Sequence, residues 1–192
     1  MSNTSTSRTR SVLPELHRLD DRVHRAVRGH FGDPASATVT ATVTVSKTLS
    51  WCGEHAGGWI VLGLAGAAVD TERRGNWLRA TGTVAAAHLA SMAIKRVVRR
   101  PRPGGPGLEP LVSTAGRHSF PSSHATSSAA AALAFAPLLP VSALAPAAGA
   151  VCLSRLVVGV HYLSDVAGGA ALGAGIAAAG RSWISKGCRS DG

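Results

Sequence analysis

Residues 154–165 read SRLVVGVHYLSD, which sets a guanidinium, an imidazole and a carboxylate among otherwise mostly apolar residues. His161 and Asp165 are four residues apart, so on a helix they share a face and the carboxylate can accept a hydrogen bond from one imidazole nitrogen. The other nitrogen remains available, with the cation of Arg155 six residues upstream, and this arrangement is typical of a nucleophile or base that acts on an anion. The alternative is a structural ion pair at a helix end, which also occurs in apolar sequence.

Long uncharged runs surround this stretch. The 192 residues amount to one domain, and they are 45% hydrophobic but only 4% aromatic. Residues 129–153 carry no charge, and residues 57–69, 80–94 and 166–180 are uncharged apart from His88. Such runs fit helices that cross a bilayer better than the core of a soluble protein, and the abundant Gly and Ala permit close helix contacts in lipid.

The formal net charge of +10 raises the question of nucleic-acid binding. The Arg residues are concentrated beside the apolar runs, and no aromatic residues interleave with them as stacking platforms, so the sequence disfavours a nucleic-acid partner. Flanking of membrane segments is the expected use of these cations. The three cysteines form no C-x-x-C pair, which indicates neither a disulfide framework nor a zinc site.

The hydrophobic pattern predicts an all-α membrane bundle with about six transmembrane helices and an N-terminal amphipathic helix. Residues 1–10 are expected to be disordered, and residues 11–34 form the amphipathic helix, with His24 among its solvated residues. Residues 35–51 alternate Thr with Ala or Val as a strand would, but a lone strand in lipid leaves its backbone unsatisfied, so a weak first spanning helix is predicted there. The spanning helices are expected at residues 35–51, 57–70, 76–95, 122–136, 141–158 and 161–185, before a C-terminal tail at 186–192.

The last predicted helix carries four glycines on faces that are expected to pack closely against neighbouring helices. They are Gly168, Gly169, Gly173 and Gly175.

A cluster of cations precedes a proline-rich turn. Its five members are Lys95, Arg96, Arg99, Arg100 and Arg102. Pro101 and Pro103 end the helix and hold Arg102 in a stiff turn. The cluster fits a topology signal and, because Lys95, Arg99 and Arg102 fall near one face, it also fits a phosphate site.

A helix is predicted to begin at Ser122, after a Gly- and Pro-rich loop over residues 104–120. The first backbone N–H groups of a helix have no internal partner, so the turn from Ser122 to His124 is a natural anion cradle to which hydroxyls and an imidazole add donors. An ordinary Ser N-cap without a function is the alternative.

Three separated stretches form one pattern: Lys95-x6-Arg102-Pro103, Pro121-Ser-Ser-His124 and Ser154-Arg155-x5-His161-x3-Asp165. This pattern resembles the tripartite signature of the type 2 phosphatidic acid phosphatase (PAP2) superfamily, which reads K-x6-R-P, P-S-G-H and S-R-x5-H-x3-D. Order, internal spacing and surrounding hydrophobicity all agree. One position departs, because Ser123 stands where the family usually has Gly. That residue chiefly offers its backbone N–H to phosphate, so a small Ser should preserve the contact.

The resemblance implies an integral-membrane lipid phosphatase, with a PAP2-like domain over residues 35–185 and a site fold shared with vanadium haloperoxidases. It implies that His161 attacks phosphorus, that Asp165 orients His161, and that His124 protonates the departing oxygen through a phosphohistidine route. The phosphate oxygens would be held by Lys95, Arg102, Ser122, Ser123 and Arg155. No metal or other cofactor is expected, because cations and helix-start amides supply the positive charge that phosphoryl transfer needs, and no carboxylate cluster for Mg²⁺ is visible.

Two alternatives are a haloperoxidase that binds vanadate in the same pocket and a catalytically silent membrane scaffold. The uncharged runs disfavour the first, since that enzyme type is soluble and larger, and the filled signature positions disfavour the second. The expected partners are the bilayer and a lipid phosphate, such as a prenyl phosphate or pyrophosphate, phosphatidic acid, phosphatidylglycerol phosphate or a prenyl-phosphate sugar. Positive-inside reasoning predicts a multi-pass cell-membrane protein whose motif segments face outward, with both termini and the Arg73–Arg74 turn on the cytoplasmic face.

Overall fold

The computed structural model describes residues 4–31, 37–52, 56–106, 108–114 and 116–185. Over these ranges the protein is all-α. The described residues form no β-sheet, and their β-type pairing is limited to one isolated bridge between Pro101 and His118. The helices are α1 (Thr4–His30), α2 (Ala37–Cys52), α3 (Gly57–Val69), α4 (Arg74–Val98), α5 (Ser123–Ala134), α6 (Val141–Val157) and α7 (Leu163–Ser185). The all-α prediction is confirmed, including the choice of helix over strand for α2.

The first helix begins at Thr4, seven residues earlier than the predicted amphipathic helix over 11–34. Residues 1–3 and the predicted tail at 186–192 lie outside the described residues.

Length and apolar composition together separate α7 from the other elements. Within the described ranges, only the segment Leu163–Ile184 is both long and apolar enough to cross a membrane. Helices α3 and α6 are apolar but have 13 and 17 residues. At about 1.5 Å of rise per residue, α3 extends about 20 Å, which is short of a hydrocarbon core of about 30 Å. The helix lengths therefore do not confirm six spanning helices.

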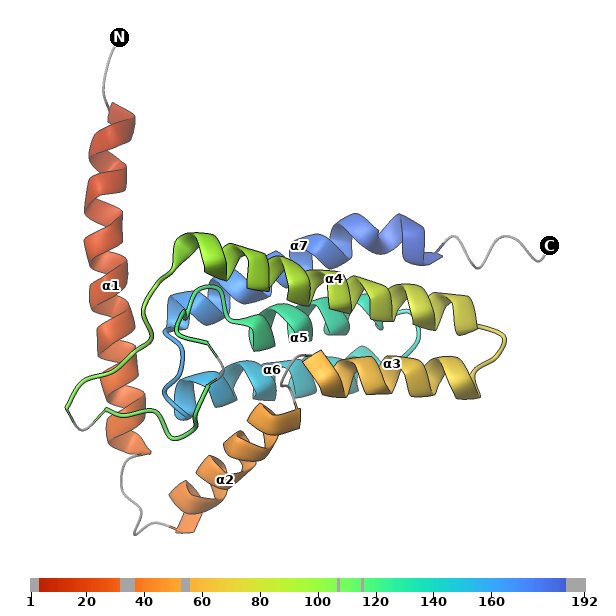
Figure 1. The fold of residues 1–192 in the computed structure, drawn as a ribbon, viewed down its shortest axis with the longest axis horizontal. Helices are drawn as coiled ribbons and strands as arrows, with labels where there is room; N and C mark the ends of the chain where they lie inside the picture. Colours follow the sequence, from red (N-terminus) through yellow and green to blue (C-terminus); the bar gives the residue numbers. More distant parts are fainter. Residues whose placement is uncertain (1–3, 32–36, 53–55, 107, 115, 186–192) are drawn as a thin grey trace.

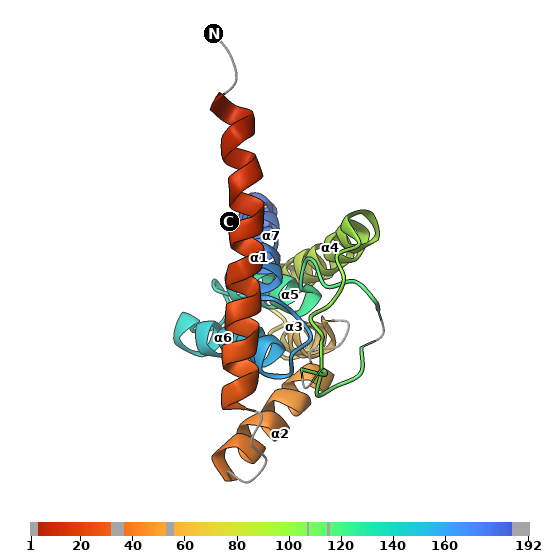
Figure 2. The same cartoon turned by 90° about the vertical axis from the view of Figure 1, so that its left-hand side faces the viewer.

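Helix α1 lies across one end of a bundle formed by α3 to α7, with α5 in the middle (Figure 1). At this end α4 finishes and α5 and α7 begin, whereas the turn between α3 and α4 and the C-terminal end of α7 lie at the other end (Figures 1 and 2). Helices α2 and α3 run in the same sense along the bundle axis (Figure 1). The described part of α1 thus lies at the end of the bundle where the motifs meet, and the described end of α7 lies at the other end (Figure 1).

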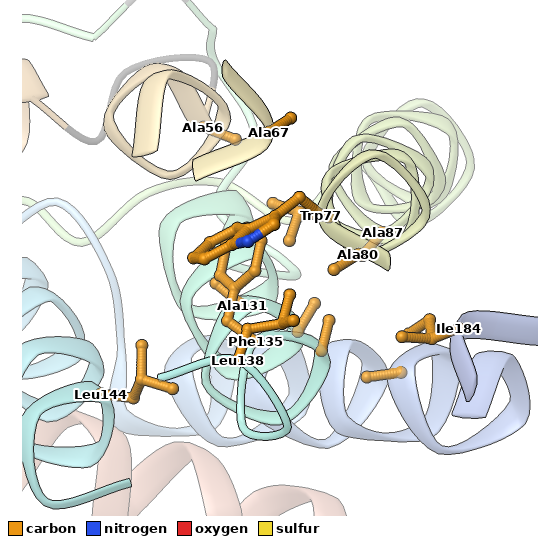
Figure 3. Packing of buried hydrophobic residues seen from close by; sticks show 14 residues of the cluster. Ala56, Ala67, Trp77, Ala80, Ala87, Ala131, Phe135, Leu138, Leu144 and Ile184 are labelled. Carbon is orange, nitrogen blue, oxygen red and sulfur yellow. The ribbon is translucent and has the colours of Figure 1, made fainter. Parts of the chain in front are cut away.

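The core between α3, α4 and α5 is built on two aromatic rings. Trp77 of α4 packs on Phe135, which follows α5, with ring centroids 5.6 Å apart (Figure 3). Helix α3 approaches this pair through Gly66, since a Cβ there would lie 2.4 Å from the Trp77 ring. Small residues surround the rings, so the bundle is held by close backbone approach as well as by buried apolar area.

Helices α5 and α7 make the closest backbone contact that bears on the predicted site. A Cβ on Gly173 would lie 2.0 Å from the carbonyl oxygen of Thr126, and one on Gly169 would lie 2.5 Å from that of Ser122. Gly168 packs on the ring of Phe120. The close-packing prediction is thus confirmed for three glycines and wrong for Gly175, which has no atom within 4 Å of an added Cβ.

This contact yields a stability prediction. Gly173→Ala should lower the free energy of unfolding by about 1–3 kcal/mol, because the methyl group overlaps the α5 backbone and the helices must separate. Gly175→Ala is the matched control in the same helix, and it should be neutral or stabilising because Ala is the better helix former. Thermal unfolding in one detergent compares the two variants. Equal melting temperatures for both would contradict the close contact.

Candidate active site

Each predicted signature segment reaches the end of the bundle that α1 covers. Helix α4 ends at Val98, and the left-handed φ of 52° at its C-cap residue Arg99 turns the chain before Pro101 and so directs Arg102 back toward the bundle. The second segment opens α5, with Ser122 as its N-cap accepting from the N–H of Ala125 at 3.5 Å. The third segment forms the end of α6, the turn at residues 158–162 and the start of α7.

His161 lies in the turn before α7 and is 4% exposed. Its Nδ1 faces Oδ2 of Asp165 at 3.6 Å, which is longer than a hydrogen bond. The same carboxylate oxygen accepts the backbone N–H of Tyr162 at 2.8 Å. Asp165 therefore closes the first turn of α7 in the manner of a capping box while it faces the imidazole, as the four-residue spacing predicts.

Arg102 fixes the other side of the His161 ring. Its guanidinium donates to the carbonyl oxygens of Gly116 and Val160 at 2.8 and 2.9 Å, and its Nη1 lies 3.4 Å from Nε2 of His161. A guanidinium has donors only, so this last contact is a hydrogen bond when Nε2 carries the lone pair. The ring proton then belongs on Nδ1, on the side of Asp165.

The electrostatic surroundings keep His161 neutral. Burial is the main cause that lowers the pKa of His161 from 6.5 to about 4. The carboxylate of Asp165 opposes this shift, and the charges of Lys95 and Arg102 add to it. Above about pH 4 the imidazole is unprotonated, which is the form that can act as a nucleophile.

Lys95 and the serines of the second segment join the same region. Lys95 donates to the carbonyl oxygens of His118 and Ser119 at 3.2 and 3.1 Å. The backbone N–H of Ser122 donates to the carbonyl oxygen of Asp165 at 2.9 Å, which ties the start of α5 to the start of α7. The hydroxyl of Ser123 lies 2.8 Å from that of Ser91 on α4. The side chain of Ser123, at the position where the family usually has Gly, thus points toward α4 and bonds Ser91 there.

His124 and Arg155 complete the predicted set. His124 is half-buried in the first turn of α5, two residues after the N–H that is bonded to Asp165. Arg155 is 2% exposed, and its guanidinium bonds the hydroxyl of Ser154 at 3.1 and 3.2 Å and the carbonyl oxygen of Ser46 on α2 at 3.4 Å. All the predicted site residues thus lie on the segments that meet at this end of the bundle.

Two charged residues outside the signature, Arg100 and Asp20, form a hydrogen-bond network with Asp165. Arg100 donates to Oδ1 of Asp165 at 2.9 Å, to the hydroxyl of Ser164 at 2.6 Å and to Asp20 of α1 at 2.8 Å. Its guanidinium also stacks 4.4 Å from the centroid of Tyr162. Burial lowers the pKa of Arg100, but the hydrogen bonds and charges of Asp20 and Asp165 outweigh this effect and the net pKa is raised.

Asp20 is 1% exposed and fastens α1 to the start of α7. Its two oxygens accept the backbone N–H of Ser164 at 2.9 Å and the Ser164 hydroxyl at 2.5 Å, besides the Arg100 contact. The sequence signal that could have found Asp20 is an acidic residue at helical spacing from Leu16 and Val27, on the apolar face of the predicted amphipathic helix. His24 lies one turn further along this face and is also buried, so its assignment to a solvated face is wrong.

The described part of the chain contains no group of three or more His, Cys, Asp or Glu residues that could hold a metal ion.

Comparison with known proteins gives the family. A family model described as the PAP2 superfamily matches residues 76–187. The decaprenylphosphoryl-5-phosphoribose phosphatases of Mycolicibacterium smegmatis and Mycobacterium tuberculosis are 44% and 45% identical to this chain, over 82% and 71% of it and 84% and 77% of their own lengths. A transmembrane PAP2-type phosphatidylglycerolphosphate phosphatase from Bacillus subtilis has a similar fold, with a TM-score of 0.51 and 22% identity over 90% of this chain and 95% of that one. The chain therefore belongs to the PAP2 superfamily, and it is an enzyme of the phosphatase class.

Proposed function

We propose that this protein is a membrane lipid phosphatase that removes the terminal phosphate monoester from a prenylphosphoryl-phosphoribose lipid. The observation that carries the proposal is the similarity to two phosphatases named for such a lipid, at 44% and 45% identity. The site supports a phosphate monoester as the reacting group, because it joins a neutral imidazole to the cations of Lys95 and Arg102.

In the proposed mechanism, Nε2 of His161 attacks phosphorus and forms an N–P bond as the P–O ester bond breaks. His124 gives a proton to the departing oxygen. Water then attacks the phosphohistidine with His124 as base, which releases inorganic phosphate and restores His161. Lys95, Arg102 and Arg155 neutralise the phosphate oxygens, and Ser123 offers its backbone N–H at the helix start. Ser122, whose N–H is already bonded to Asp165, shapes this turn.

Asp165 stabilises the imidazolium that forms on attack, so its position matters. Arg100 and Asp20 act as positioning residues, since Arg100 holds Oδ1 of Asp165 and Asp20 holds Arg100. The oxygen that faces His161 is Oδ2, and it is fixed separately by the N–H of Tyr162.

The test is a phosphate-release assay on purified protein in detergent. Prenylphosphoryl-5-phosphoribose should be the best substrate in a panel with prenyl phosphate, prenyl pyrophosphate, phosphatidic acid and phosphatidylglycerol phosphate. A clear preference for a glycerolipid in this panel would overturn the proposed substrate class while leaving the enzyme class intact.

The same proposal includes a multi-pass arrangement in the cell membrane with the active site on the extracytoplasmic face. In a background without Cys52, Cys152 and Cys188, an impermeant thiol reagent added to intact cells should label Gly105→Cys, in the loop after α4. Gly75→Cys, beside the basic turn at the other end of the bundle, should stay unlabelled until the cells are opened. The reverse labelling pattern would place the active site on the cytoplasmic face and contradict the proposed topology.

Metal removal should leave turnover unchanged. The proposed site draws its positive charge from Lys95, Arg102 and Arg155, so activity should survive EDTA, and vanadate should inhibit it by mimicking five-coordinate phosphorus. Phosphate release before and after chelation measures the first effect. Loss of turnover that Mg²⁺ restores would exclude the mechanism.

A further inference from the structure

We infer that a cavity between α1, α2 and the loop at 108–114 binds a second, non-reacting phosphate of the substrate, namely a phosphodiester joined to an isoprenoid chain. This inference rests on the proposed function, and it assigns a second anion site next to the catalytic one.

The cavity has a volume of about 290 Å³ and a mixed lining. Its walls come from the last turn of α1 and the residue after it, from one face of α2 and from one loop residue. They are formed by Arg28, Phe31, Val39, Thr40, Val43, Thr44, Lys47 and Leu111. Two cations, two hydroxyls and four apolar side chains thus surround it, and no carboxylate is among them.

Arg28 is the residue that most needs an anion. It is 8% exposed, and among the residues that the structure describes its Nη2 alone has a hydrogen-bond partner, the carbonyl oxygen of Glu109 at 3.1 Å. Its Nε and Nη1 are buried without a hydrogen-bond partner, and no carboxylate pairs with it among the described residues. A buried cation without a counter-charge is costly, and a phosphate oxygen would supply both the charge and the acceptors.

The cavity adjoins the catalytic segment. A Cβ on Gly159 would lie 3.2 Å from Cδ of Arg28, and the N–H of Leu111 donates to the carbonyl oxygen of Val158 at 2.9 Å. Gly159 is two residues from His161, so their Cα atoms are at most about 7 Å apart. On the α2 side, Arg155 bonds the carbonyl oxygen of Ser46, the neighbour of Lys47. The cavity thus contacts the turn that carries His161, and we take one lipid headgroup to span the two sites.

The lipid that names the relatives has the matching chemistry. Its 5-phosphate is a monoester, whereas the phosphoryl group between the prenyl chain and the ribose is a diester with one negative charge. With the monoester at His161, the diester reaches Arg28 and Lys47, and the first isoprene units meet Val39 and Val43 of α2. A lipid with a single phosphate leaves this second site empty, so the cavity gives selectivity for lipids that carry both groups.

The test uses prenylphosphoryl-ribose, which keeps the diester and lacks the reacting monoester. Its binding to the full-length protein in detergent is measured by calorimetry, with the neutral prenyl riboside as a control for apolar contacts. Arg28→Met should weaken binding about 10- to 100-fold, the range for loss of hydrogen bonds to a charged group. Lys47→Met, at an exposed position, should weaken it about 3- to 10-fold. Arg25→Met, on the exposed side of α1, is the matched control and should bind as the wild type does.

The outcomes separate this inference from the proposed function. Unchanged affinity for prenylphosphoryl-ribose in Lys47→Met and in folded Arg28→Met overturns the second site, whatever lipid is hydrolysed. If Arg28→Met fails to fold, Lys47→Met decides. A matching loss of affinity for inorganic phosphate would assign the cavity to free phosphate and overturn the lipid assignment. Failure of the wild type to release phosphate from prenylphosphoryl-5-phosphoribose counts against the proposed function alone, because the diester binding is measured without turnover.

Discussion

His161→Ala should abolish phosphate release and leave no trapped phosphoenzyme. The side chain is the proposed nucleophile, and no neighbouring group can replace an imidazole whose Nε2 faces Arg102 at 3.4 Å. The expected loss exceeds about 10⁴-fold in kcat, the scale on which removal of a covalent catalyst acts. Rapid-quench labelling with a radioactive phosphate monoester measures the intermediate directly. An acid-labile phosphoenzyme in His161→Ala would reassign the nucleophile.

His124→Ala is the informative partner of that variant. It should slow release from lipid alkoxides severely, because their oxygen needs a proton on departure. It should spare much of the first step for an aryl phosphate with an acidic phenol, which leaves without a proton. Equal losses of rate on both substrates would show that His124 does not protonate the leaving group.

Asp20→Ala should lower kcat by about 10- to 100-fold with little change in KM, although Asp20 lies outside every signature segment. Its removal takes away one of the two carboxylates that hold Arg100, so the guanidinium that bonds Oδ1 of Asp165 is held less firmly and Asp165 is positioned less precisely. Asp20→Asn keeps an acceptor for Ser164 and should recover part of the rate. The rate of phosphoenzyme formation in a single turnover is the readout, since it reports on His161 rather than on substrate binding.

The neighbouring Asp21 gives a matched control on the same helix, because it is exposed. Asp21→Ala should keep the wild-type rate. If Asp20→Ala merely lowers the melting temperature and forms phosphoenzyme at the wild-type rate, then Asp20 has a structural role only. A rise in KM without a fall in kcat would instead assign Asp20 a role in substrate binding.

The local features of this fold were predictable from sequence. Apolar runs bounded by Gly, Pro and charged residues placed α3 to α7 within a few residues of their observed bounds. The four-residue spacing predicted that Asp165 faces His161, and the Ser122 N-cap followed from a helix that starts there. Each of these features depends on residues that are close in sequence.

The features that were missed depend on contacts between distant residues. Asp20 and Arg100 are 80 positions apart, and no periodicity reports that one meets the other. A hydrophobic face on α1 has the same pattern whether it covers a membrane or the end of a bundle, so no role was predicted for Asp20 and His24 was wrongly assigned to the solvated face. Likewise, small residues at 173 and 175 look alike in sequence, and only the position of α5 distinguishes them.

The ion pair between α1 and the bundle sets a boundary for engineering. A fragment cut to the family-matched residues 76–187 would retain all signature side chains but lose Asp20, and with it one of the carboxylates that hold Arg100. Minimal versions of this enzyme should therefore be designed from α1 onward. In a chimaera that exchanges the N-terminal helix between relatives, the incoming helix must carry Asp20 and the receiving bundle must carry Ser164. Otherwise the incoming helix must supply another acceptor for Arg100.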